Sequence, residues 1–263
     1  MLSVDNVSVI ETKFGGPFVE GYRKKPNGTE LRWKQIGMKE IFLMIDLPYT
    51  PMRLDHVSYA ASHDQISDVV NRIGSQIGTA FVDGGIHPKF GTRNFTAPLL
   101  NGQYIEVVCS LDHPATELTP FGRAVKKKSE EGGGWMSWVL ATDDISKVEE
   151  NFNRSAIDGE RKKPNGAILK WKQIGVLEVL EDFSQPFFVE WISSEHPSKD
   201  GNAFAKISEI VLGADKAKIH KSVYDQIIAM PQDSVISFGK IGDTEPGIRQ
   251  IVFEYKGRYI PID

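Results

Sequence analysis

YIEVV, at residues 104–108, is an apolar stretch with a single carboxylate, and an acidic-His-Pro loop, DHP, follows it at residues 112–114. The same arrangement returns further along as FVEWI at residues 188–192, followed by EHP at residues 195–197. Short apolar runs rich in β-branched and aromatic residues predict a strand in each place. A strand and loop that recur together indicate two copies of one structural unit, which bears on the whole fold.

The segments in front of these two strands also correspond. Each copy predicts a strand, a helix and three further strands. The predicted elements of the first copy are strand 54–61, helix 64–77 and strands 79–83, 92–100 and 103–109. Those of the second copy are strand 135–142, helix 144–154 and strands 157–163, 167–175 and 186–192. The fold class is therefore predicted as α+β, with paired βαβββ modules whose curved mixed sheets enclose a cleft for a ligand.

Four segments are expected along the chain. Residues 52–130 form module one and residues 131–200 form module two. Residues 201–263 form a shorter C-terminal βαββ unit. Its predicted elements are strand 206–213, helix 217–229 and strands 233–239 and 249–256. Residues 1–51 are expected to be a partial repeat of the module-two segment.

The partial repeat is the clearest internal similarity. Residues 23–37 and residues 161–175 are related by an offset of 161 − 23 = 138, and 12 of their 15 paired positions are identical. Chance does not produce such a match. One interpretation makes residues 1–51 an assembly element whose strands complete a sheet edge in the same chain or in another.

Composition excludes several classes of protein. Against 35 Asp and Glu the 263 residues contain 31 Lys and Arg, a net charge of −4, so no overall field attracts nucleic acid. Cys109 is the only cysteine, which rules out an internal disulfide and thiolate zinc sites. We find no signal peptide and no apolar run that could cross a bilayer. These features predict a cytoplasmic protein with no nucleic-acid or membrane partner, whose partner is a small molecule and which can form a homo-oligomer.

Several spaced motifs between residues 52 and 200 resemble the glyoxalase-like domain family. They are GGIHPKFGTRN (84–94), YIE (104–106), GERKKPNG (159–166), LKW (169–171), PFFVEW (186–191) and HP (196–197). This family belongs to the vicinal-oxygen-chelate superfamily, which includes glyoxalase I, extradiol dioxygenases, epimerases and antibiotic-binding resistance proteins. The resemblance implies the paired βαβββ fold, but it does not imply one reaction.

The resemblance also implies a divalent metal, Zn, Mn, Ni or Fe, held by a His or Gln on the first strand of each module and by a Glu on the last strand. His56 and Glu106 occupy these positions in module one, and Glu190 is the counterpart of Glu106 in module two. The fourth position falls on Met136 or its neighbours, which are not ligands for such a metal. Without a metal, Glu106 or Glu190 is expected to act as a general base. The alternatives are a His56 bonded to a backbone carbonyl and a Glu106 that faces solvent.

Other polar and aromatic residues are predicted to line the cleft. The substrate-binding candidates are His87, Thr92, Asn94, Trp171 and Trp191. Trp171 can equally be a packing residue. The run Arg161–Lys163 is interpreted as a solvated hairpin rather than an anion site, and His113 and His196 as structural residues.

These features predict a glyoxalase-like protein that acts on or binds a small molecule between the modules. In one form of this hypothesis the protein uses a divalent metal. That version would be a metal-dependent lyase, isomerase or oxygenase. The alternative is a metal-free module that binds or sequesters a ligand, as the bleomycin-resistance proteins do. Metal content separates the two.

Overall fold

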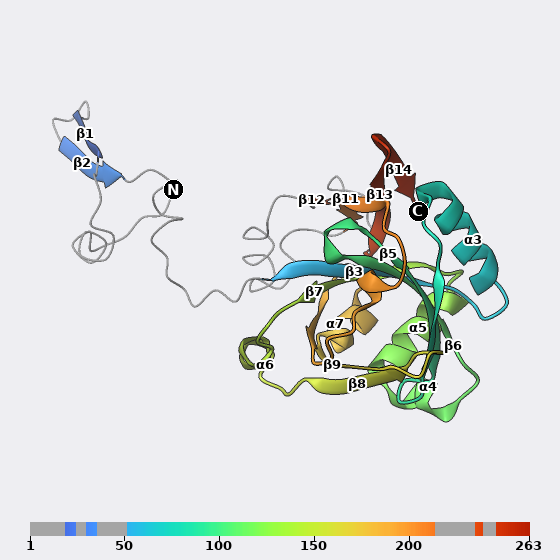
Figure 1. Ribbon diagram of the computed structural model, residues 1–263. Coiled ribbons are helices and arrows are strands. Elements are labelled where there is room, and N and C mark those ends of the chain that lie inside the picture. The colour runs from blue at the N-terminus through green and yellow to red at the C-terminus, as the bar shows by residue number, and fades with distance from the viewer. Residues whose placement is uncertain (1–18, 25–29, 36–51, 214–234, 239–245) are drawn as a thin grey trace. The chain divides into compact units, whose positions relative to one another are not determined.

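The computed structural model describes residues 19–24, 30–35, 52–213, 235–238 and 246–263 (Figure 1). The chain divides into two units, residues 1–49 and residues 50–263. In the first unit, strand β1 (Val19–Lys24) pairs antiparallel with strand β2 (Glu30–Gln35). Among the helices of the described ranges, none has the length and apolarity needed to span a bilayer.

The second unit contains the two predicted βαβββ modules. Module one consists of β3 (Arg53–Ala60), α3 (Ile66–Ile77), β4 (Val82–His87), β5 (Thr92–Pro98), the short helix η1 (Leu100–Gly102) and β6 (Tyr104–Ser110). Module two consists of β7 (Gly134–Ala141), α6 (Ser146–Phe152), β8 (Ile157–Lys162), β9 (Ile168–Ile174), α7 (Val176–Glu181) and β10 (Phe187–Trp191). Helices α4 (Pro114–Leu118) and α5 (Pro120–Glu130) connect the modules, and η2 (Pro197–Lys199) follows β10. The predicted α+β fold with βαβββ modules is confirmed.

The sheets of the two modules join into one closed barrel with the strand order β10-β7-β3-β6-β5-β4-β8-β9. In each module the first strand runs parallel to the last one, as β3 does to β6 and β7 does to β10. The modules meet along β3 and β7, and again where β4 and β8 pair at Ile86 and Lys162. Because side chains alternate along each strand, one set of residues points into this barrel and the other set points out.

Two apolar clusters separate along this alternation. The outer cluster combines strand residues such as Val57, Ile105 and Trp138 with helix α3 and with the C-terminal sheet. The inner cluster combines inward-facing strand residues with residues of α5 and α7. The barrel interior is thus partly filled by apolar side chains, and a pocket occupies part of the remaining space.

The C-terminal sheet has the order β12-β11-β13-β14. Its strands are β11 (Ala205–Leu212), β12 (Val235–Phe238), β13 (Ile248–Tyr255) and β14 (Arg258–Ile262). The indole Nε1 of Trp135 donates to the carbonyl oxygen of Ile262, at 2.8 Å, and so ties β14 to the barrel. Strand β14 was not predicted, and the predicted helix 217–229 lies outside the described residues.

Strand β4 also differs from its prediction, since it begins at Val82 and continues through Gly84 and Gly85 to His87. Adjacent glycines weaken a strand prediction. Here they sit at a β-bulge between Asp83 and Gly85, where Gly85 has a φ of 94°. The bulge lets the strand continue to the residue that matters for the site, His87.

The internal repeat is a repeat of one hairpin. At the offset of 138, β1 and β2 correspond to β8 and β9, and the pairing is the same: Val19 pairs with Gln35 as Ile157 does with Gln173. The matching sequence is therefore accompanied by matching strand register.

Candidate functional site

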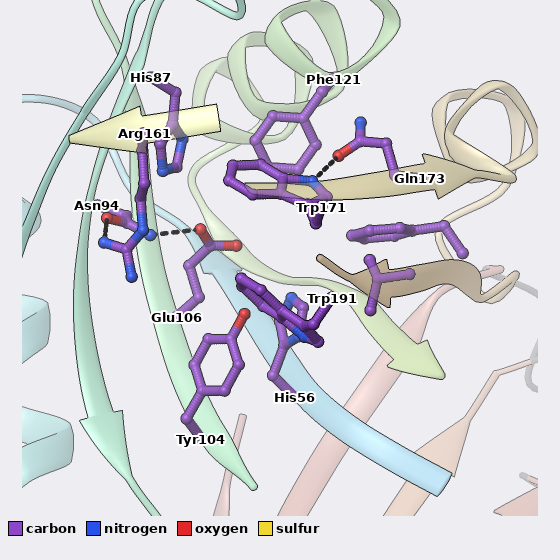
Figure 2. Close-up of a pocket in the computed structure, with 12 residues that line it drawn as sticks. His56, His87, Asn94, Tyr104, Glu106, Phe121, Arg161, Trp171, Gln173 and Trp191 are labelled. Carbon is purple, nitrogen blue, oxygen red and sulfur yellow. Dashed lines mark hydrogen bonds between the residues drawn. The ribbon is translucent and has the colours of Figure 1, made fainter. Parts of the chain in front are cut away.

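A pocket lies inside the barrel and is open in part to solvent (Figure 2). Every barrel strand except β7 contributes to it, together with α5. Its lining residues are His56, His87, Asn94, Tyr104, Glu106, Phe121, Arg161, Trp171, Gln173, Phe187, Val189 and Trp191. The lining has a polar side and an aromatic side, which is the usual division of a small-molecule site.

Glu106 is the centre of the polar side. Its Oε1 accepts a hydrogen bond from the Asn94 amide at 2.7 Å, and its Oε2 accepts one from the Ser58 hydroxyl at 2.8 Å. Burial alone would raise the pKa of this carboxyl. The two hydrogen bonds, and the imidazoles of His56 and His87 when they are protonated, outweigh burial, so the pKa lies below its ordinary value. Glu106 is therefore an ionised acceptor with lone pairs left for a ligand.

Arg161 extends this network. Its guanidinium donates to Asn94 Oδ1 at 3.0 Å and to the carbonyl oxygen of Gly84. A Cβ at position 84 would collide with both Asn94 and Arg161, which explains the glycine. Arg161 is only 2% exposed, so the prediction of a solvated hairpin was wrong for this residue. The cause is the alternation along β8, which turns Arg161 inward while Lys162 stays exposed.

His87 lies beside Arg161 in the pocket lining, and one of its ring nitrogens has a hydrogen-bond partner (Figure 2). Its Nδ1 lies 2.9 Å from the Thr92 hydroxyl, and its Nε2 is buried without a hydrogen-bond partner in the part of the chain that the structure describes. Burial, assisted by the charge of Arg161 and opposed by that of Glu106, lowers the pKa of His87 to about 4. The ring is therefore neutral near pH 7.

His56 lies at the other end of the polar side, beside Asp55. Asp55 is 1% exposed and receives three hydrogen bonds: 2.9 Å from His56 Nδ1, 3.1 Å from His196 Nε2 and 3.2 Å from Trp191 Nε1. Burial would raise the pKa of Asp55, but the hydrogen bonds and charges of His196 and His56 hold it well below its usual range. His56 also stacks on Tyr104, with ring centroids 4.3 Å apart and an interplanar angle of 19°.

The aromatic side is built around Trp171 and Trp191, whose rings lie 5.7 Å apart. The Trp171 indole donates to Gln173 Oε1 at 2.7 Å, which fixes its orientation. A Cβ at position 159 would collide with the Trp171 ring, so Gly159 on β8 leaves room for it. Trp171 both packs in the inner cluster and lines the pocket, as both interpretations of the sequence expected.

A family model described as a glyoxalase-like domain matches residues 54–228. The chain belongs to the glyoxalase-like domain family. The matched stretch contains all the residues that line the pocket. A search of curated proteins finds no match for this glyoxalase-like protein.

Several solved structures resemble it at low identity. A hypothetical protein from Staphylococcus aureus is 18% identical, with 81% of this chain and 86% of that chain covered and a TM-score of 0.49. A methylmalonyl-CoA epimerase from Mycobacterium tuberculosis is 12% identical, with 52% and 85% covered and a TM-score of 0.35. A Streptomyces coelicolor methylmalonyl-CoA epimerase in complex with 2-nitronate-propionyl-CoA is 15% identical, with 56% and 97% covered and a TM-score of 0.36. At these identities, the likenesses do not identify a ligand for the glyoxalase-like protein.

The structure brings together most of the residues predicted for the site. His56, His87, Asn94, Glu106, Trp171 and Trp191 line one pocket. Thr92 lies behind the lining and holds His87. Glu190 is not brought to the pocket: its Oε2 accepts from the backbone N–H of Ile145 at 3.2 Å, while its neighbours Val189 and Trp191 point inward. Aligning β6 with β10 by Glu106 and Glu190 therefore displaced the predicted register of β10 by one residue. A displacement of one residue moves each side chain to the opposite face of the strand.

The predicted metal ligands do not assemble in this glyoxalase-like protein. Within the described ranges, no three His, Cys, Asp or Glu side chains are grouped so that they could hold a metal ion. The residue of β7 paired with His56 is Val139, and Met136 is buried in the inner apolar cluster. The residues present therefore do not fit the ligand set formed by His56, Glu106 and Glu190.

Sequence reasoning missed four polar residues of the site: Asp55, Tyr104, Arg161 and Gln173. A signal was present for two of them, because Arg161 and Gln173 lie in the 15-residue repeat and are identical in both copies. For Asp55, no sequence signal shows that it shares a face with His56. That arrangement depends on an irregularity of strand β3 between Leu54 and His56.

Proposed function

We propose that this glyoxalase-like protein binds a small molecule inside the barrel without a metal, with a hydroxyl or amine of the ligand against Glu106 and its planar part against Trp171 and Trp191. The observation that carries the proposal is the buried Nε2 of His87, which lines the pocket without a hydrogen-bond partner in the described part of the chain. An unsatisfied buried polar atom costs about 1–3 kcal/mol, and a ligand group that reaches it would remove this cost.

The polar side supports a ligand that donates hydrogen bonds. Glu106 is ionised and acceptor-only, and Asn94 and Ser58 use one lone pair on each of its oxygens. The Thr92 hydroxyl can donate or accept, so His87 Nε2 can present either a proton or a lone pair to the ligand. Arg161 adds a buried positive charge that keeps the network in place.

The pKa values argue against Glu106 and His87 as general bases. A base that works near neutral pH needs a pKa near that pH. The pKa of Glu106 lies below its ordinary value, and the pKa of His87 is about 4. Both groups are therefore assigned to ligand binding, in contrast to the expectation that Glu106 removes a proton.

Tryptophan fluorescence tests the proposal, because Trp171 and Trp191 both border the pocket. The protein is purified without chelators and titrated with a panel of small aromatic alcohols, amines and carboxylates. We expect alcohols and amines to bind in preference to carboxylates. Glu106→Gln is expected to weaken their binding about tenfold or more, as loss of a hydrogen bond to a charged group does. Glu190→Gln, outside the pocket, serves as the matched control and is expected to bind like wild type.

Elemental analysis of the same samples tests the metal-free part of the proposal. We expect less than stoichiometric metal after incubation with Zn²⁺, Mn²⁺, Ni²⁺ or Fe²⁺, and unchanged ligand binding. About one metal per chain, lost in the double variant His56→Ala, Glu106→Ala, would contradict the proposal and favour the metal-dependent alternative.

A further inference from the structure

Tyr104 brings a second unused polar group to the pocket, since it lines the pocket and is only 4% exposed. Its hydroxyl has no hydrogen-bond partner among the described residues, and in particular none in Glu106, two positions further along β6. A buried tyrosine hydroxyl usually has such a partner, because its burial without one costs free energy. Figure 2 shows the hydroxyl directed toward the space that Glu106 and Trp191 border. The group is therefore available to a ligand.

The ring of Tyr104 is held in place by its neighbours. Strand pairing sets Tyr104 beside His56, and the two rings stack with centroids 4.3 Å apart at an interplanar angle of 19°. The ring of His196 meets Tyr104 edge-on, with centroids 5.5 Å apart. On β6, Tyr104 and Glu106 project from the same face because they are two residues apart. The direction of the hydroxyl is thus set before a ligand enters, which lowers the entropic cost of a bond to it.

The surroundings of the hydroxyl select the kind of group that it would bind. Burial, together with the charges of Asp55 and Glu106, raises the pKa of Tyr104 well above its ordinary value, although the charge of Arg161 opposes this. The hydroxyl therefore keeps its hydrogen and can donate it. A donor on the ligand would be bound more strongly by the ionised Glu106 than by a phenol oxygen. The two carboxylates also repel an anion at this place. An uncharged acceptor, such as a carbonyl oxygen, fits best.

We infer that Tyr104 is a specificity-determining residue, whose hydroxyl donates a hydrogen bond to an uncharged carbonyl oxygen of the ligand. The inference rests on the proposed function, in which Glu106 accepts from a hydroxyl or amine of the same ligand. It narrows the ligand class to planar compounds that carry a hydrogen-bond donor and a neutral carbonyl group at separate positions. Aryl hydroxyketones are the simplest members of this class.

The meta and para isomers of hydroxyacetophenone, each compared with its isopropenylphenol analogue, test the inference. The members of each pair differ only by a carbonyl oxygen in place of a methylene group. Isothermal titration calorimetry measures their affinities without interference from ligand absorbance. Tyr104→Phe removes the hydroxyl and keeps the ring that stacks on His56. We expect this variant to lower the affinity for the better-binding ketone about two- to tenfold, as loss of one neutral hydrogen bond does, and to leave that for its alkene unchanged.

Tyr59→Phe is the matched control, because the Tyr59 hydroxyl accepts from Arg72 at 3.2 Å and Tyr59 is not part of the pocket lining. It is expected to bind both compounds like wild type. Equal weakening of ketone and alkene by Tyr104→Phe would overturn the inference, since Tyr104 would then contact the hydroxyl that both compounds share. If Glu106→Gln weakens both compounds and Tyr104→Phe weakens neither, the proposed function stands and only the role of Tyr104 is overturned.

A measurement on the wild type covers the case in which Tyr104→Phe does not fold. The infrared stretching band of a ¹³C-labelled ketone carbonyl moves to lower frequency when the oxygen accepts a hydrogen bond. We expect the bound ketone to show this lowered band. A band at the frequency found in a dry alkane would overturn the inference without any variant. If neither the ketones nor the alkenes bind to the wild type, the proposed function fails and the role of Tyr104 fails with it.

Discussion

Gly84 lies in contact with Arg161 where the two modules meet, and its carbonyl oxygen accepts a hydrogen bond from the guanidinium. This contact admits no side chain at position 84, since a Cβ there would collide with Arg161 and Asn94. Because Asn94 also donates to Glu106, the absence of a side chain at position 84 leaves room for the hydrogen-bonded network of Arg161, Asn94 and Glu106.

Gly84→Ala is therefore expected to displace Arg161 and Asn94, to cost about 1–3 kcal/mol in the free energy of unfolding, and to weaken ligand binding. Urea denaturation and tryptophan fluorescence measure the two effects. Gly102→Ala is the control: no atom lies within 4 Å of the added methyl, so only backbone strain at φ 70° is expected. Equal ligand binding by both variants would contradict the role assigned to Gly84.

The depressed pKa of His87 predicts a pH-dependent stability. The pKa is about 4 in the folded protein against 6.5 for the unperturbed group, so the unfolded chain binds the proton first as pH falls. The free energy of unfolding should therefore fall with pH, by about 3 kcal/mol in all, of which about 2 kcal/mol is lost between pH 6.5 and 5.

Urea denaturation from pH 7 to pH 5 measures this effect. His87→Gln should flatten the profile, because Gln has no proton to gain in the unfolded chain. His63→Gln is the matched control, since His63 is exposed and its replacement should preserve the wild-type slope. A His87→Gln profile as steep as that of the wild type would show that His87 does not titrate as the structure predicts.

The fold was predictable because the two modules repeat their elements and their strands alternate clearly. The place of Glu106 in an apolar strand and in the family motif favoured an inward position, and its burial in the pocket lining excludes the solvent-facing alternative. Glu190 was misplaced because two strands aligned by sequence can differ by one residue in register, and one residue reverses the face. Asp55 was not predictable, because its contact with His56 depends on a bulge that local sequence does not specify.

Removing residues 1–51 is expected to leave the barrel intact. The outer and inner clusters that hold it together consist of residues from Met52 onward in the described part of the chain. Circular dichroism and tryptophan fluorescence of residues 52–263 should therefore indicate a folded protein that binds the ligand panel. Light scattering on both forms tests the assembly alternative, which predicts a smaller oligomer after the deletion. An unfolded 52–263 chain would contradict the separation into two units.

The positions that differ between residues 23–37 and residues 161–175 predict where the barrel tolerates a change of side chain. Within residues 161–175, the differing positions are Ala167, Ile168 and Lys170, which are Thr, Glu and Arg in the first copy. None of the three is buried, and Ile168 is 50% exposed. All the buried positions of this stretch, from Arg161 to Gly175, are identical in the first copy.

The triple variant A167T/I168E/K170R, which gives residues 161–175 the sequence of residues 23–37, is therefore expected to keep the wild-type pocket. Its free energy of unfolding should change by about 0.5 kcal/mol or less, as is usual for surface substitutions. Leu169→Ala, at a buried position between the changed ones, should cost about 2–5 kcal/mol. Denaturation and titration with the ligand panel compare the three proteins. A triple variant as unstable as Leu169→Ala would contradict this prediction. The sequence of residues 23–37 would then be unable to form a stable β8–β9 hairpin in the barrel, and the two copies would have diverged in function as well as in sequence.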